Sequence, residues 1–135
     1  MEEMSLFVDT SAFYALLDAD DEHHRKAAGA WQELIGSEQD AVTSNYILVE
    51  TFALIQRRLG FEAVRGFQDE IVPVLNVEFI TPGLHRFGIA ALLAASRRDL
   101  SLVDCVSFEV MRELGIKTAF AFDPHYREYG FAVIP

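Results

Sequence analysis

The stretch Ser5–Phe13 reads SLFVDTSAF, and it decides which fold and which kind of site the chain can have. Three apolar residues run directly into Asp9, and two hydroxyl side chains, Thr10 and Ser11, follow before the chain becomes apolar again. This pattern predicts a buried strand followed by a helix. In open parallel α/β sheets, ligands bind beyond the carboxyl ends of the strands. Asp9 is therefore either a reactive carboxylate at a sheet edge or the N-cap of the helix that follows.

The chain as a whole alternates between extended and helical patterns, without repeats or a long linker. Its 135 residues fit a single domain spanning 1–135. Strands are predicted over 5–9, 41–43, 74–80, 117–122 and 131–134, and helices over 11–18, 23–35, 45–59, 61–70, 82–98 and 102–114. Such alternation predicts an α/β fold in which a mostly parallel sheet lies between helix layers.

Composition restricts the possible functions. The net charge of −10 comes from 21 acidic and 11 basic residues. A surface of this kind repels nucleic acid, so activity on nucleic acid needs a local basic patch, a metal or both; a basic partner protein is equally compatible. No apolar stretch reaches the roughly 20 residues of a membrane span, and the segment Met1–Met4 is acidic, unlike a secretory leader. We therefore expect a cytoplasmic protein without membrane contact, with the single Cys105 as a small core residue.

Four carboxylates lie in apolar surroundings, and each has a second interpretation. Besides Asp9, Glu50 is the only ionisable residue in ILVETFALI, where it either faces a site or points to solvent. Asp104 lies at a predicted helix start, where Ser101 and an acidic residue three positions later resemble a capping box. Asp123 ends an apolar strand, where Asp-Pro is also a common turn opener. Taken together, the four suit a site better than four separate caps and surface charges.

A cluster of carboxylates indicates a hard divalent cation such as Mg²⁺. Without a cation, crowded carboxylates repel one another and their pKa values rise. A bound cation removes the repulsion, lowers the pKa of a bound water and stabilises a phosphoryl oxyanion. No His/Cys spacing in the chain suggests zinc instead.

Four segments, VDTSAF, ILVETFALI, LSLVDCVSFEVM and TAFAFDPHY, resemble in order and spacing the PIN-domain ribonucleases, and among them the VapC-type toxins. The resemblance covers about Leu6 to Ile134. It implies a three-layer α/β/α sandwich with a central, mostly parallel sheet. It also implies an endoribonuclease dependent on Mg²⁺ or Mn²⁺ that hydrolyses RNA phosphodiester bonds as the toxin of a type II toxin–antitoxin pair.

The resemblance assigns roles to particular residues. Asp9, Glu50, Asp104 and Asp123 fall on the four acidic positions, catalytic and metal-binding, and Thr10 or Ser11 falls on the supporting polar position after the first acid. The last acid varies within the family, so Asp99 is an alternative to Asp123. Family members commonly dimerise and are blocked by a cognate antitoxin, often through a basic side chain in the acidic pocket. We therefore expect RNA as substrate, an antitoxin partner and a homodimer.

One arginine and three histidines are further candidates for a role near the site. Arg57 shares a helix face with Glu50 and is the candidate RNA contact, or else an ordinary solvated arginine. His23 and His24 are expected on a surface helix rather than as a metal pair. His125, beside Asp123, has a better chance of lying near the site, although a turn residue is favoured.

Two alternative functions come from other protein classes. A haloacid-dehalogenase type of enzyme wants a second Asp two residues after the first, where this chain has Ser11. The second alternative is a catalytically silent binding module that holds a basic protein partner in the same acidic pocket. The sequence is compatible with it as well.

Overall fold

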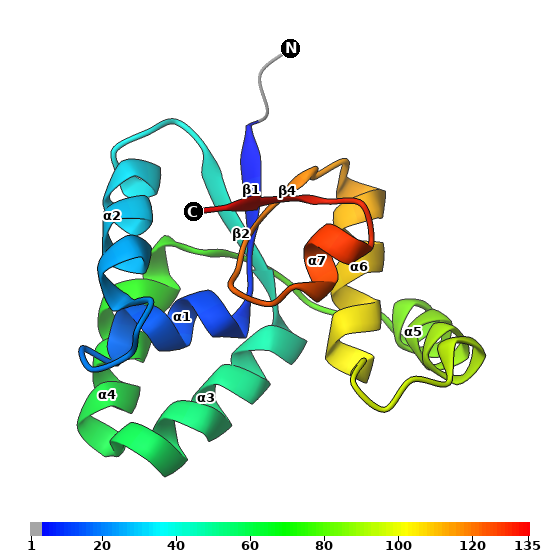
Figure 1. Cartoon of the computed structure of the whole chain (residues 1–135), viewed down its shortest axis with the longest axis horizontal. Coiled ribbons are helices and arrows are strands. Elements are labelled where there is room, and N and C mark those ends of the chain that lie inside the picture. The colour runs from blue at the N-terminus through cyan, green and yellow to red at the C-terminus, as the bar shows by residue number, and fades with distance from the viewer. Residues whose placement is uncertain (1–3) are drawn as a thin grey trace.

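The computed structural model describes residues 4–135, and the centre of that part of the chain is a sheet of five parallel strands (Figure 1). The expectation that the acidic segment Met1–Met4 is unlike a secretory leader concerns mainly Met1–Glu3, which lie outside the described residues. The strand order is β3-β2-β1-β4-β5. The strands are β1 (Ser5–Val8), β2 (Asp40–Ser44), β3 (Asn76–Glu78), β4 (Thr118–Phe120) and β5 (Ala132–Ile134). The predicted parallel sheet is confirmed.

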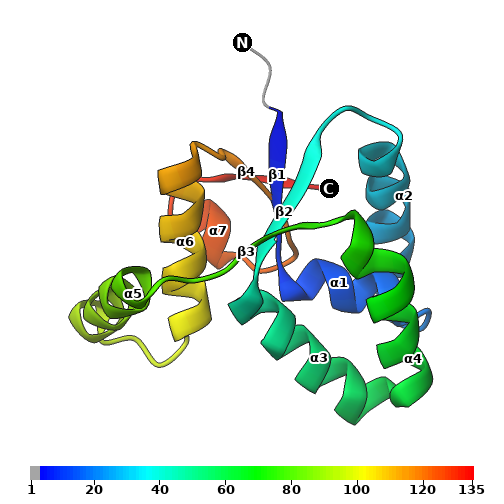
Figure 2. The same cartoon turned by 180° about the vertical axis from the view of Figure 1, so that it is seen from behind.

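Helices cover both faces of this sheet. Figures 1 and 2 show α1 to α4 gathered on one side and α5 to α7 on the other. The helices are α1 (Thr10–Leu17), α2 (His24–Ile35), α3 (Asn45–Leu59), α4 (Phe61–Gly66), α5 (Pro82–Ala95), α6 (Leu102–Leu114) and α7 (His125–Glu128). Since parallel strands need crossover connections, the alternating pattern in the sequence leads directly to these layers. The predicted three-layer α/β/α sandwich is confirmed.

The differences from the predicted elements lie mainly at their ends. After α4 the chain continues through a π-helical turn, Phe67–Ile71, and a 3₁₀ turn that contains Pro73, because proline cannot continue the hydrogen bonding of the α-helix. The helix α5 ends at Ala95, three residues earlier than predicted, where Ser96 takes a left-handed conformation with φ of 49°. The short helix α7 was not predicted, since four residues are too few for a periodic pattern.

The buried face of α3 differs from the predicted one. Periodicity suggests Leu48, Phe52, Ile55 and Leu59 as its core stripe, but the buried side chains are those of Ile47, Thr51 and Ile55. Leu48, Phe52 and Leu59 pack only partly buried against the core. The helix is thus rotated by part of a turn, which brings a polar residue, Thr51, into the interior.

The remaining core follows the apolar pattern closely. Phe7 and Val8 of β1 and Phe120 of β4 are fully buried, and Cys105 is buried as expected. Trp31 is partly buried and packs against the same core. Among the described residues, none of the helices is both long and apolar enough to span a membrane.

The topology brings distant parts of the chain to one edge of the sheet. The central strands β1 and β4 are parallel neighbours, so the residues that follow Val8 and Phe120 emerge side by side. The strand β2 runs directly into α3, with Ser44 accepting a hydrogen bond from the Ile47 N–H as the N-cap. The start of α3 therefore lies at the same edge, which is where the predicted carboxylates meet.

Candidate active site

Asp9 both caps a helix and faces the predicted site. As the N-cap of α1, its Oδ2 accepts hydrogen bonds from the Ser11 N–H at 3.1 Å and the Ser11 hydroxyl at 2.6 Å. Its Oδ1 accepts a hydrogen bond from the buried Tyr126 hydroxyl at 2.8 Å. The residue is only 5% exposed, and burial raises the pKa of its carboxyl despite these three donors. The two interpretations of Asp9 are therefore compatible.

The two hydroxyl residues after Asp9 hold the site together. The Ser11 hydroxyl donates to Asp9 and accepts a hydrogen bond from the Phe122 N–H at 2.9 Å, which joins the ends of β1 and β4. The buried Thr10 hydroxyl lies 3.0 Å from the Thr51 hydroxyl of α3. Ser11 thus holds the Asp9 carboxylate, and Thr10 links α1 to α3.

Glu50 extends from α3 toward the other acids. The residue as a whole is exposed, yet the pKa of its carboxyl is raised, first by partial desolvation and then by the charges of Asp9, Asp104 and Asp123. A hydrogen bond with Thr10 opposes this rise. Glu50 is thus solvent-exposed, yet its carboxyl is near enough to Asp9, Asp104 and Asp123 for their charges to raise its pKa.

Asp104 forms the capping box that the sequence suggests and also lies in the cluster. The Asp104 N–H donates to the Ser101 hydroxyl at 3.0 Å, and Asp104 Oδ2 accepts from the Ser101 N–H at 3.1 Å. The residue is 8% exposed. The pKa of its carboxyl is raised, mainly by burial and further by the charges of Asp123 and Asp9. The cap orients the carboxylate without neutralising its charge.

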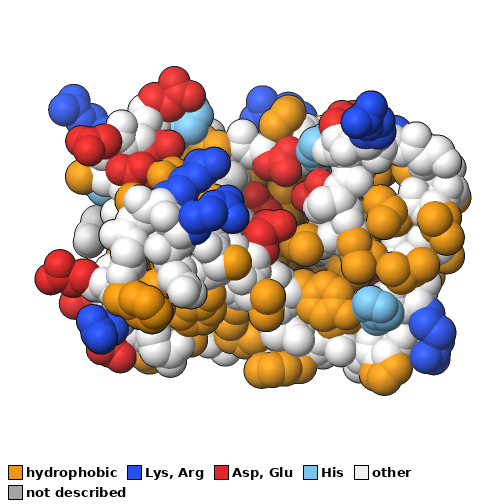
Figure 3. Space-filling model, turned by 90° about the horizontal axis from the view of Figure 1, so that it is seen from below, with side chains coloured by type: hydrophobic (Ala, Val, Ile, Leu, Met, Phe, Trp, Pro, Cys, Tyr) orange, Lys and Arg blue, Asp and Glu red, His pale blue; other side chains and the backbone are white. Residues whose placement is uncertain are grey.

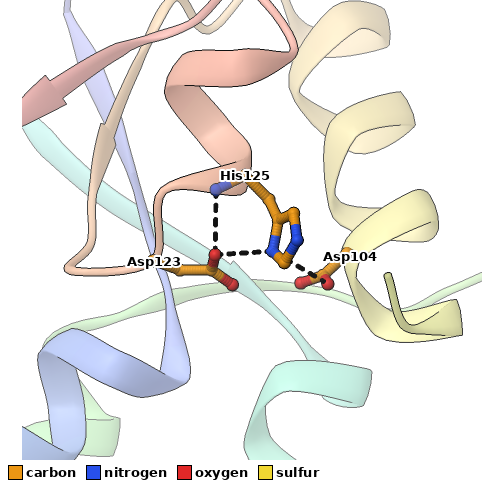
Figure 4. Close-up of side chains that lie close together, drawn as sticks. All are labelled: Asp104, Asp123 and His125. Atoms are coloured by element: carbon orange, nitrogen blue, oxygen red, sulfur yellow. Dashed lines mark hydrogen bonds and ion pairs between the residues drawn. The ribbon is translucent and has the colours of Figure 1, made fainter. Parts of the chain in front are cut away.

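Asp123 comes close to Asp104 through a histidine between them, as Figure 4 shows. Asp123 Oδ1 accepts a hydrogen bond from the His125 N–H at 2.9 Å and lies 2.7 Å from His125 Nδ1. The same Nδ1 lies 3.8 Å from Asp104 Oδ2. Ligand atoms of these three residues all lie within 4.8 Å of one another. Of the two interpretations of His125, the favoured one as a turn residue is wrong, since α7 directs its ring toward Asp123 and Asp104, near the predicted site.

The surface view agrees with this arrangement. In Figure 3, which looks onto the edge where β1 and β4 end, acidic side chains surround a hollow near the centre, and Lys or Arg side chains lie beside it. Three of the four acids, Asp9, Glu50 and Asp104, have raised carboxyl pKa values. Mutual repulsion and burial of this kind are what a bound cation would relieve. The donor set of carboxylate oxygens and one imidazole fits a divalent metal.

Comparison with known proteins identifies the fold. A family model for the PIN domain matches residues 6–132. The chain belongs to the PIN-domain family. It is 36% identical over 130 residues to the 23S rRNA-specific endonuclease VapC20 of Mycobacterium tuberculosis, covering 96% of this chain and 97% of VapC20. The crystal structure of VapC20, a Sarcin-Ricin loop cleaving toxin, matches with a TM-score of 0.84 over 96% of this chain and 99% of the other.

More distant PIN-like structures show the same fold at low identity. FitAcB from Neisseria gonorrhoeae has a TM-score of 0.70 and 11% identity, with 96% of both chains covered. VapBC2 from Rickettsia felis, bound to a DNA fragment from its promoter, has a TM-score of 0.69 and 8% identity, with 96% and 97% covered. These similarities concern the fold alone.

In this PIN domain, Asp99 does not take the place of Asp123. Its side chain is 63% exposed and lies at the far side of the His125 ring, with Oδ2 at 3.2 Å from Nε2. Arg97 binds it through two nitrogens, Nε at 3.1 Å and Nη2 at 2.9 Å. Arg97 and then His125 lower the pKa of the Asp99 carboxyl to about 2. Asp99 is therefore a paired surface carboxylate that contacts the site through His125.

The remaining sequence candidates lie outside the acid cluster. Arg57 is exposed in the last turn of α3, two turns beyond Glu50 on the same helix, and its role in RNA binding stays a prediction. His23 stacks on Phe122 with ring centroids 4.3 Å apart, whereas His24 Nδ1 contacts the Ala15 carbonyl at 2.8 Å. The two histidines therefore have different partners.

Two contacts in this region were not predicted from the sequence. One is the position of the His125 ring between Asp123 and Asp104, for which the sequence offered only the place of His125 two residues after Asp123. The other is Tyr126, which appeared only as part of the motif but supplies a buried hydrogen bond to Asp9. Beside them lies a cavity of about 460 Å³, with Asp123 in its wall. Its other lining residues come from the end of β4, α7 and β5: Ala121, Phe122, Pro124, Arg127, Glu128, Val133 and Pro135.

Proposed function

We propose that this PIN domain is a VapC-type endoribonuclease that hydrolyses RNA phosphodiester bonds with the help of Mg²⁺ or Mn²⁺. The observation that carries the proposal is the 36% identity, over nearly the full length of both chains, to an rRNA endonuclease. The geometry supports it, because the acids at the motif positions converge at one edge of the sheet. The 23S rRNA that VapC20 is specific for is the first substrate to test.

The chain's own residues prepare this site in three ways. Ser11 and Tyr126 hold the Asp9 carboxylate from both of its oxygens. Ser101 holds Asp104 at the start of α6, and the N–H of His125 holds Asp123. These three acids are thus oriented before a substrate arrives, which reduces the reorganisation required during reaction.

We assign the metal to Asp9, Glu50, Asp104 and Asp123. A divalent metal, when bound, supplies a water of lowered pKa and stabilises charge on the phosphoryl oxygens. The acids would bind it in their ionised form, so the raised pKa values of Asp9, Glu50 and Asp104 mean that protons compete with the metal. Metal affinity should accordingly rise with pH.

The role in the cell follows from the similarity to VapC20, which is described as a toxin. We infer that the chain is the toxin of a type II pair and that a cognate antitoxin binds it. An acidic site in a chain of net charge −10 suits a basic side chain from such a partner. Exposed apolar side chains, including Phe79 at 73% and Leu93 at 70%, are available for protein contacts such as a homodimer.

Cleavage of ribosomal RNA tests the catalytic proposal. Purified protein is incubated with ribosomes and Mn²⁺ or Mg²⁺, and the new RNA ends are sequenced. We expect a defined cut that disappears with EDTA and in Asp9→Asn. Equal cleavage by Asp9→Asn would indicate a contaminating nuclease and remove the proposal.

Thermal unfolding tests the metal separately from turnover. A ligand present at about 100 times its Kd stabilises the folded state by about 2.7 kcal/mol, which raises the midpoint by about 10 °C for a chain of this size. We expect such a rise with Mn²⁺ in the wild type and a much smaller one in Asp104→Asn. Binding of metal without any RNA cleavage would favour a silent binding module.

A further inference from the structure

His125 is placed between two groups of carboxylates. On one side its Nε2 lies 3.2 Å from Asp99 Oδ2. On the other side its Nδ1 lies 2.7 Å from Asp123 Oδ1 and 3.8 Å from Asp104 Oδ2. The side chain is 15% exposed, so water reaches little of the ring. Both ring nitrogens therefore face acidic oxygens.

The protons of this ring can be assigned from its neighbours. An ionised carboxylate only accepts hydrogen bonds, so the Asp99 contact places a proton on Nε2. In the neutral ring, Nδ1 then carries a lone pair directed at Asp123 and Asp104. Nδ1 is buried and makes no hydrogen bond of acceptable geometry, although Asp123 Oδ1 is close. Such close contacts with carboxylate oxygens require a positive charge at this place, which either a second proton on the ring or a bound cation can supply.

Surrounding ion pairs hold the ring in this orientation. Arg97 binds Asp99 and also reaches α7, where its Nη1 lies 2.6 Å from Glu128 Oε1. Because α7 carries both Glu128 and His125, Arg97 links the segment before α6 to the helix that presents the imidazole. Histidines that ligate metals typically donate their other ring N–H to a carboxylate, which sets the tautomer and orients the ring. Asp99 occupies that position here.

We infer that His125 Nδ1 is a ligand of the divalent metal, together with Asp104 and Asp123, and that Asp99 and Arg97 are positioning residues for it. The ligand atoms of the three residues lie within 4.8 Å of one another, close enough to share one ion. The inference rests on the proposed metal-dependent function and adds a nitrogen to its all-oxygen ligand set.

A nitrogen ligand changes which metal the site prefers. Mg²⁺ takes oxygen ligands and keeps several waters, whereas imidazole suits first-row metals such as Fe, Ni, Cu and Zn. Mn²⁺ shares the oxygen ligands of Mg²⁺ but belongs to that first-row series, so a nitrogen ligand favours Mn²⁺ over Mg²⁺. We therefore expect the protein to bind Mn²⁺ at least tenfold more tightly than Mg²⁺, and His125 to account for most of that preference.

Pulsed electron paramagnetic resonance of bound Mn²⁺ provides the direct test. A coordinated imidazole adds a ¹⁴N coupling to the Mn²⁺ signal, and the measurement needs no RNA cleavage. We expect this coupling in the wild type and its loss in His125→Gln. The Mn²⁺ affinity of the variant should be at least about tenfold lower than that of the wild type, with little change in Mg²⁺ affinity. His85→Gln serves as the matched control, because His85 lies on α5 and its ring contacts the hydroxyl of Tyr46 on α3, outside the acid cluster.

A second variant keeps the test decisive if His125→Gln folds poorly. In Asp99→Asn the imidazole stays, so the ¹⁴N coupling should persist while Mn²⁺ affinity falls by about tenfold, the lower end of what loss of such a carboxylate costs. Bound Mn²⁺ without ¹⁴N coupling in the wild type would overturn the inference and leave the metal site intact. Absence of Mn²⁺ binding altogether would overturn the proposed function as well.

Unchanged or tighter Mn²⁺ binding in His125→Gln would also contradict the inference. It would show that His125 is present as an imidazolium that competes with the metal for the carboxylates.

Discussion

Asp99 and Asp104 lie five residues apart at the entrance to the same helix, yet their carboxyl groups behave in opposite ways. The pKa of Asp99 is lowered to about 2, because Arg97 and His125 bind its ionised form. The pKa of Asp104 is raised, because burial and the charges of Asp123 and Asp9 disfavour ionisation. The chain thus supplies its own cation to one carboxylate and leaves the other among acids. Carboxylates held in this way are suited to a cation from solution.

The largest expected effect separates these two residues by activity. Asp104→Asn should reduce RNA cleavage at saturating Mn²⁺ by about 10²–10³-fold, the scale on which loss of one charge-stabilising group acts. Asp99→Asn also removes one negative charge, but from a carboxylate that is paired with Arg97. This variant should retain most of the cleavage at saturating metal. Single-turnover rates measure both, with circular dichroism to check folding. Equal losses in the two variants would contradict the division of roles.

A smaller effect, on stability, is expected at Tyr126, whose hydroxyl donates a hydrogen bond to Asp9 in the acid cluster. Tyr126→Phe leaves the buried Asp9 Oδ1 without its donor and should lower the free energy of unfolding by about 1–3 kcal/mol. Urea denaturation of the metal-free protein measures this loss. Tyr129→Phe is the matched control, since the Tyr129 hydroxyl makes only a long contact of 3.4 Å with Arg97. A control variant as destabilised as Tyr126→Phe would exclude the hydrogen bond as the cause.

The dependence of stability on pH should be determined by the ionisable groups of the acid cluster. The pKa values of Asp9, Glu50 and Asp104 are raised, and that of His125 is raised as well: burial lowers it, but Asp99, Asp123 and Asp104 more than compensate. For all four, the folded state binds protons more tightly than the unfolded chain. Their contribution to stability is therefore present at low pH and lost as pH rises through the folded pKa values.

We accordingly expect the metal-free protein to become less stable from pH 5 to pH 8, as measured by its thermal midpoint in EDTA. Asp99 does not alter this trend, because its lowered pKa acts only in more acidic solution. Saturating Mn²⁺ should reverse the slope, since metal competes better as protons leave. A midpoint that rises with pH in EDTA would show that the acids are not coupled as described.

The smallest expected effect concerns Arg57, the cation nearest in sequence to Glu50, the acidic residue of α3. If it contacts a phosphate, Arg57→Ala should weaken RNA binding a few-fold and reduce the salt dependence by about 0.7 in the logarithmic slope. Fluorescence anisotropy with catalytically inactive protein at several salt concentrations measures this change. Arg112→Ala, at the opposite end of α6 from Asp104, should leave the slope unchanged.

Much of the fold was predictable because local patterns determine the elements. Apolar runs such as SLFV predict the strands, and Gly60 and Gly115 mark the ends of two helices that the structure confirms. The helix α7 and the rotation of α3 could not be predicted. A four-residue helix has no period to detect, and the buried face of α3 depends on contacts such as that of Thr51 with Thr10.

The sequence by itself determined the α/β architecture and the acids that could meet, because strand–helix alternation and motif spacing are local properties. Only the tertiary structure decided which groups share a charge environment. It placed Asp99 with Arg97, directed Tyr126 to Asp9 across 117 positions, and turned His125 toward Asp104 and Asp123. These relations depend on distances across the sheet edge, and electrostatic interaction depends on distance in space rather than along the chain.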